Sequence, residues 1–121
     1  MRRLLHERER LERAKARLDQ LELYDAPVSL ARVRVLVEPR LFRAPGLRRY
    51  HGYSFWRTIV VRDENASSDL LTHELCHVWQ AQRRPFPQLW AWLRHPYRSN
   101  PFEREARAAV AATRSTGPVR I

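Results

Sequence analysis

The chain of 121 residues is long enough for one compact domain and leaves little room for a second, so we expect residues 1–121 to form a single domain. Its 44% hydrophobic residues, with four Trp, four Tyr and four Phe, exclude a disordered chain. No stretch approaches the roughly 20 consecutive apolar residues of a membrane span. A charged N-terminus and a single cysteine, Cys76, predict a cytoplasmic protein without an internal disulfide.

The formal net charge is +10, from 23 Lys plus Arg against 13 Asp plus Glu. Such a surface attracts polyanions, and nucleic acid is therefore one partner to consider. The arginines are spread along the chain, and near the N-terminus they alternate with glutamates, so we expect a solvated surface in preference to a nucleic-acid interface. The composition does not indicate an oligomeric state.

The first half of the chain contains one helical pattern and several strand patterns. Residues 2–23 carry leucines at seven-residue spacing, which predicts an N-terminal amphipathic helix. Residues 31–38 alternate Arg with Val, as a half-buried strand does. Residues 41–53 contain Pro-Gly and a later Gly, and predict a turn followed by the start of another strand. Residues 55–63 give the strongest strand prediction in the chain.

The second half of the chain is predicted to be helical. Ser67 and its neighbours can cap a helix over residues 69–83, which prolines follow. Residues 88–94 predict a short helix, and Asn100-Pro101 is a typical start for a last helix over residues 102–113. The order of strands and helices predicts an α+β fold.

The stretch LTHELCHVWQ, residues 71–80, places three titratable side chains in the middle of a predicted helix. His73 and His77 are four residues apart and therefore project from one helix face, where both imidazoles can bind the same ion. Glu74 is rotated away from them, in reach of a water on the metal. This H-E-x-x-H pattern predicts a zinc site with two histidine ligands and a glutamate as general base.

A catalytic zinc needs a third protein ligand, which the motif does not contain. Gln80 and Arg83 stand where an extended H-E-x-x-H-x-x-G-x-x-H motif has glycine and histidine, so that subclass is excluded. Glu103 and Glu105 are candidates from the last predicted helix, and only one of them can face the metal because they are two residues apart. His95 is a further candidate from outside that helix.

HELCHVWQ followed by NPFEREA and preceded by TIVVRD resembles the gluzincin metallopeptidases, in particular the single-domain minimal gluzincins, over about half the chain. The resemblance implies a small zincin-like fold, with a short, mainly antiparallel sheet packed on two ligand-bearing helices. It also implies that Glu103 is the third ligand and Ala106 its small neighbour. Arg107 stands where the family commonly has an aspartate that supports a ligand histidine, and arginine cannot accept a hydrogen bond.

The expected function is zinc-dependent hydrolysis of peptide bonds by a metal-activated water, with a peptide or protein as substrate. His73, His77 and Glu103 would hold Zn²⁺, and Glu74 would act as general base. The resemblance further implies that the strand at residues 57–62 forms the upper edge of the cleft and aligns an extended substrate. Two alternatives stay open, a nucleic-acid-associated zinc protein and a non-catalytic interaction module that zinc stabilises.

Overall fold

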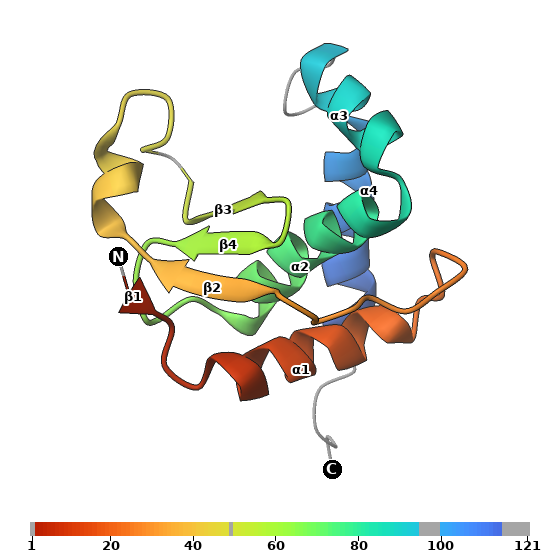
Figure 1. The fold of residues 1–121 in the computed structure, drawn as a ribbon, viewed down its shortest axis with the longest axis horizontal. Coiled ribbons are helices and arrows are strands. Elements are labelled where there is room, and N and C mark those ends of the chain that lie inside the picture. Colours follow the sequence, from red (N-terminus) through yellow and green to blue (C-terminus); the bar gives the residue numbers. More distant parts are fainter. Residues whose placement is uncertain (1, 49, 95–99, 115–121) are drawn as a thin grey trace.

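The computed structural model describes residues 2–48, 50–94 and 100–114, and over these residues the chain has an α+β fold (Figure 1). In chain order, its elements are β1 (Arg2–Arg3), α1 (Glu7–Asp19), β2 (Arg34–Val37), the 3₁₀ helix η1 (Pro39–Arg43), β3 (Gly52–Phe55), β4 (Thr58–Val61), α2 (Ser68–Arg83), α3 (Pro85–Arg94) and α4 (Pro101–Thr113). No helix within the described residues is both long and apolar enough to cross a membrane.

The sheet is mixed and has the strand order β1-β2-β4-β3. Its outer pairings, β1 with β2 and β3 with β4, are antiparallel, whereas the central strands β2 and β4 are parallel. The expectation of a mainly antiparallel sheet therefore holds for the outer pairings but misses the central one. The parallel pairing depends on a connection through η1 and β3, which no local sequence pattern describes.

The N-terminal segment differs from the prediction of one helix over residues 2–23. Arg2 and Arg3 extend the sheet by pairing with β2, and α1 begins only at Glu7. The Glu7 carboxylate accepts hydrogen bonds from the backbone N–H of Val35 (2.7 Å) and from Arg3 Nε (2.8 Å), and so fixes the start of α1 to the sheet. The contacts with β2 join residues about thirty positions apart in sequence, so a helical repeat could not reveal them.

The predicted strand over residues 55–63 is divided by a turn. Phe55 pairs with Thr58, so Trp56 and Arg57 form a two-residue hairpin loop. Trp56 has φ of 59°, a left-handed conformation that is uncommon for a non-glycine residue, and the usual Asn-Gly or Asp-Gly signal is absent. The hairpin also encloses β4 between β2 and β3. The expectation that residues 57–62 form the open edge is therefore wrong, because that edge belongs to β3.

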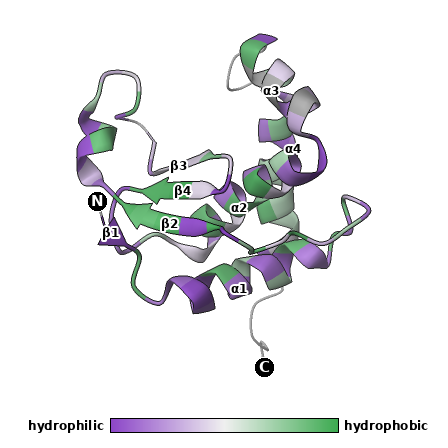
Figure 2. Cartoon of the chain, viewed as in Figure 1, coloured by the Kyte–Doolittle hydropathy of each residue, from purple (hydrophilic) through white to green (hydrophobic). Residues whose placement is uncertain are grey.

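One face of the sheet packs on helices and forms the core of the molecule. Alternate residues of β2 and β4, such as Val35 and Ile59, are buried against α1 and α2. Figure 2 shows β2 and β4 as the most hydrophobic strands and β1 as hydrophilic. α2 is the central helix, since it contacts α1, α3, α4 and β3. Its bounds confirm the prediction of a helix over residues 69–83.

The last helix is fixed to the others by a buried arginine of α1. Arg17 Nε donates to Thr113 Oγ1 (3.1 Å) and its Nη2 donates to the carbonyl of Val110 (3.2 Å), both on α4. Its Nη1 lies 2.9 Å from a carboxylate oxygen of Asp69 on α2. One guanidinium therefore joins three helices, with its donors satisfied as burial requires. The bounds of α4 confirm the predicted helix over residues 102–113, whereas α3 begins at Pro85, earlier than residue 88.

Candidate metal centre

Two histidines of the H-E-x-x-H motif face the same side of α2. Ser67 is the N-cap of this helix, since its hydroxyl accepts a hydrogen bond from the backbone N–H of Leu70 (3.0 Å). The cap fixes where the helix starts. The rings of His73 and His77 lie edge to face, with centroids 4.9 Å apart. Four-residue spacing on a helix thus produces two neighbouring imidazoles, as the sequence pattern predicts.

The first turn of α4 brings a carboxylate to these imidazoles. The Asn100 side chain caps α4 by accepting from the backbone N–H groups of Phe102 (2.9 Å) and Glu103 (3.3 Å), which fixes the position of Glu103. Its carboxylate lies between the two rings, with Oε1 2.6 Å from His73 Nε2 and Oε2 3.0 Å from His77 Nε2. The side chain of Glu103 is completely buried.

His73, His77 and Glu103 have the chemistry and the spacing of a metal site. One donor atom from each lies within 4.8 Å of the others. Two imidazole nitrogens and a carboxylate are a ligand set that zinc uses in catalytic sites, where a fourth position stays open. Glu103 Oε1 is buried and makes no hydrogen bond of good geometry, although His73 and Arg107 nitrogens lie 2.6 and 3.6 Å away. A cation satisfies such an oxygen, so the residues fit a bound metal.

Charge inside the cluster is balanced by the contacts between its members. Burial alone would raise the pKa of the Glu103 carboxyl, but the adjacent His73 and His77 outweigh burial and hold that pKa far below its usual range. Burial would likewise lower the pKa of His77, but the contacts with Glu103 and the nearby Glu74 raise it above its usual value. Glu103 and His77 thus stabilise each other's charged forms, and a metal at His77 Nε2 would compete with a proton for the same lone pair.

Gln80 determines which nitrogen of His77 faces the cluster. Its Nε2 donates to the carbonyl of Phe102 (2.8 Å) and to a carboxylate oxygen of Glu105 (2.9 Å), so its Oε1 must point the other way. That oxygen lies 2.8 Å from His77 Nδ1 and can only accept, hence Nδ1 carries a proton. The Nε2 lone pair of neutral His77 is then available for a metal. Gln80 also connects the two helices that carry the ligands.

Replacing Gln80 with methionine should lower zinc affinity by about 10- to 100-fold, the usual effect of losing a group that orients a ligand histidine. Methionine keeps the approximate volume of the side chain but has no carbonyl oxygen to accept the hydrogen bond from the Nδ1–H of His77. Zinc affinity is measured by competition with a chromogenic chelator. The matched control is Gln82→Met in the same helix, because the hydrogen bonds of Gln82 among the described residues go to the backbone of Ser29. Equal affinity of both variants would remove Gln80 from this role.

Glu74 lies beside the cluster but is not one of its three donor groups. It is only 6% exposed, and burial raises the pKa of its carboxyl. The hydroxyl of Ser54 on β3 hydrogen-bonds to it. β3 approaches α2 closely at Gly52, where a Cβ would lie 2.9 Å from Leu70 Cδ1, at the end of a flexible side chain, and 3.4 Å from Glu74 Cγ. The site therefore contains a buried carboxylate held by the edge strand.

The other candidate ligands lie elsewhere. Glu105 accepts hydrogen bonds from Gln80 Nε2 and from the Tyr24 hydroxyl, on a different side of α4 from Glu103. His95 lies outside the described residues. Cys76, inside the motif, belongs to the hydrophobic core, and burial raises the pKa of its thiol, which opposes metal binding. Among the described residues, the structure thus brings together His73, His77 and Glu103 and places Glu105 apart from them.

Arg107 occupies the position at which the resemblance implies an aspartate. Its Nε lies 3.6 Å from Glu103 Oε1, one helical turn away. It therefore contacts the ligand carboxylate itself and does not support a histidine. The hydrogen-bond acceptor that His77 requires is supplied instead by Gln80 of its own helix. Sequence reasoning missed this role of Gln80 and the contact of Ser54 with Glu74. The three-residue spacing from His77 to Gln80 was the available signal, since such residues are neighbours on a helix.

Comparisons of this chain with protein-family models, with curated proteins and with solved structures find no match. The chemistry of the site is therefore the main guide to function. Two imidazoles and a carboxylate can hold a divalent cation, and a neighbouring buried carboxylate can exchange a proton with a molecule bound there.

Proposed function

We propose that the chain is a zinc-dependent metallopeptidase that hydrolyses peptide bonds within a peptide or protein substrate. The observation that carries this proposal is the convergence of His73, His77 and Glu103 from two helices, with Glu74 buried at their side. A purely structural zinc site is usually closed by four protein ligands, whereas three ligands leave a position for water. A second carboxylate next to a three-ligand site is what hydrolysis requires and what simple metal storage does not.

The order of elements supports a zincin-like fold of the gluzincin type. β4 directly precedes α2, which carries H-E-x-x-H, and Glu103 stands in the first turn of α4. The sheet covers one side of α2, and α4 lies against another. This arrangement resembles the two ligand-bearing helices and small sheet of the minimal gluzincins, and it extends the likeness from the motifs to the elements that carry them.

Each residue of the site then has a defined task. A zinc ion bound by His73, His77 and Glu103 would polarise a peptide carbonyl and lower the pKa of a water molecule. Glu74 accepts the proton of the attacking water and returns it to the leaving amine. Its burial raises the pKa of its carboxyl and so makes its carboxylate a stronger proton acceptor. The hydroxyl of Ser54 restricts the orientation of that carboxylate.

The substrate would be aligned by β3. This strand is at the edge of the sheet, so one side of its backbone has no partner strand among the described residues. An extended peptide can pair with such an edge through main-chain hydrogen bonds. Because Ser54 of β3 hydrogen-bonds to Glu74, a peptide lying along β3 would pass close to the general base. β3 thus takes the role that the resemblance had implied for residues 57–62.

The proposal is tested by replacing His73 with alanine. Loss of one of three ligands should abolish both stoichiometric zinc binding and cleavage of a quenched-fluorescence peptide library. His51→Ala is the matched control, since His51 is exposed and outside the cluster, and it should retain both properties. Cleavage by the His73→Ala protein at the wild-type rate would overturn the proposed function.

A second candidate is a non-catalytic module that zinc stabilises, and the position of Arg107 favours it. Arg107 stands where the resemblance implies an aspartate that supports a ligand histidine, and it lies 3.6 Å from the ligand carboxylate instead, so the site departs from the pattern that the resemblance implies for a peptidase. In that case zinc removal would unfold the protein, while no member of a peptide library would be cut. Hydrolysis by the zinc-loaded wild type distinguishes the two functions.

A further inference from the structure

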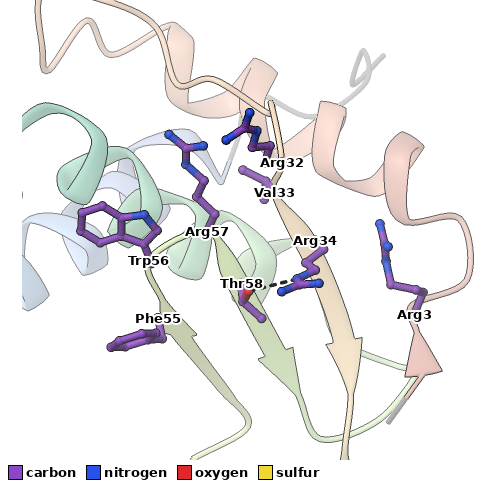
Figure 3. Close-up of a pocket in the computed structure, with 8 residues that line it drawn as sticks. All are labelled: Arg3, Arg32, Val33, Arg34, Phe55, Trp56, Arg57 and Thr58. Carbon is purple, nitrogen blue, oxygen red and sulfur yellow. Dashed lines mark hydrogen bonds between the residues drawn. The ribbon is translucent and has the colours of Figure 1, made fainter.

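The face of the sheet turned away from the core carries a distinct set of side chains. Residues that pair directly on neighbouring strands point to the same face, so the register defines this set, which we call the open sheet face. It consists of two rows of paired residues. The first row is Phe55, Thr58 and Arg34, and the second row is Tyr53, Val60, Leu36 and Arg3. None of these residues belongs to the core cluster of the described chain. In Figure 3 the strands lie in front and the helices behind them.

Aromatic rings on this side of the molecule are exposed to solvent. Phe55 is 78% exposed, Tyr53 is 48% exposed, and Trp56 in the adjoining turn is 60% exposed. Phe55 and Tyr53 are two residues apart on β3, so they project from the same face roughly 7 Å apart. Flat rings presented side by side on a strand can stack with planar groups of a ligand.

Arginines that are separated in sequence gather next to these rings. A hollow of about 790 Å³ is lined by Arg3, Arg32, Arg34 and Arg57 together with Phe55 and Trp56, and no carboxylate of the described residues lines it (Figure 3). Arg3 is paired with Glu7, but the other three have no carboxylate partner among the described residues. Arg34 Nε donates to Thr58 Oγ1 at 3.2 Å.

These arginines change the interpretation of the net charge. Their spacing along the chain had suggested a solvated surface, but the fold brings four of them around one hollow. Three guanidinium groups without carboxylate partners favour a ligand that carries several negative charges.

We propose that the open sheet face and its arginine-lined hollow bind single-stranded nucleic acid. Arg32, Arg34 and Arg57 would contact phosphates, while Phe55 and Tyr53 would stack with unpaired bases. A duplex keeps its bases stacked inside the helix, and an acidic protein presents carboxylates without a row of unpaired bases, so a single strand matches this combination of rings and arginines best. The residues of this face differ from those of the metal centre, so the proposal does not depend on peptidase activity.

The test is a fluorescence-anisotropy titration of the full chain with a labelled single-stranded oligothymidylate and with a duplex of equal length. We expect tighter binding of the single strand at equal salt. The Tyr53→Ala/Phe55→Ala protein should lose at least about thirtyfold in affinity, because two base-stacking contacts are removed. Arg34→Ala should reduce the slope of log affinity against log salt by about 0.7, the contribution of one phosphate contact.

Two control variants show whether binding depends on this face or on any exposed arginine or aromatic side chain. Trp90→Ala removes an exposed aromatic of α3, and Arg40→Ala removes an exposed arginine of η1. Both should bind the oligonucleotide as the wild type does, and so should Glu74→Gln. The absence of binding, equal losses in Arg40→Ala and Arg34→Ala, or full affinity in the double aromatic variant would overturn the proposal. Displacement of the oligonucleotide by polyglutamate at equal charge would overturn it too, since polyglutamate has no bases.

Discussion

Replacing Glu74 with glutamine should leave zinc bound and lower kcat for peptide hydrolysis by about 10²- to 10⁴-fold, the usual contribution of a general base. The amide has nearly the same shape as the carboxylate and can still hydrogen-bond to Ser54. It cannot accept a proton from water, however. Glu74 is also not one of the three clustered donors, so its loss should not release the metal.

Zinc content and hydrolysis of one peptide are measured on the same preparation of the Glu74→Gln protein. Glu12→Gln serves as the matched control, because Glu12 is exposed on α1 and should affect neither property. A Glu74→Gln protein that cleaves at the wild-type rate would remove Glu74 as the base. One that has lost its zinc would make Glu74 part of the binding site instead.

Replacing Glu103 with alanine should reduce zinc affinity by more than the roughly 100-fold that loss of an orienting group can cause, because a direct ligand is removed. Two histidines then remain, which is fewer ligands than catalytic zinc sites have. The same change at Glu105 should reduce affinity by less than about tenfold. Glu105 accepts hydrogen bonds from the nitrogen of the Gln80 amide and from the Tyr24 hydroxyl, and without Glu105 that amide keeps its bond to the Phe102 carbonyl.

Competition with a chelator of known affinity measures both variants against the wild type. Because Glu103 is buried between two histidines, its loss could also disturb the packing of α4. Circular dichroism of each protein without metal shows whether the helix content is retained. An equal loss in the two variants, or a larger loss in Glu105→Ala, would contradict Glu103 as the ligand.

Local patterns were sufficient where the structure depends on neighbours in sequence. Ser67 and Asn100 mark the starts of α2 and α4, and both act as N-caps. The spacing of His73 and His77 places them on one helix face because helix geometry is regular. The sequence left Glu103 and Glu105 as alternatives, since the choice depends on how α4 is rotated against α2.

The incorrect predictions concern contacts between distant segments or unusual backbone conformations. β1 forms because Arg2 and Arg3 pair with a strand more than thirty positions later. The local leucine spacing contains no sign of that pairing and predicted a helix there instead. The turn at Trp56 lacks glycine or asparagine, and the strand prediction therefore ran through it. The choice of β3 as the edge strand follows from that same turn. The amide of Gln80 gains its role only from Phe102 and Glu105 on another helix.

X-ray absorption at the zinc edge, recorded on the full chain loaded with one equivalent of zinc, tests the central claim most directly. We expect one tightly bound ion with two imidazole nitrogens at about 2.0–2.1 Å and a carboxylate oxygen at about 2.0–2.2 Å. His73→Ala should not retain the stoichiometric zinc and should therefore not give this spectrum. Failure of the wild type to bind zinc, a sulfur neighbour at about 2.3 Å from Cys76, or the wild-type imidazole signal in His73→Ala would contradict a zinc site made of His73, His77 and Glu103.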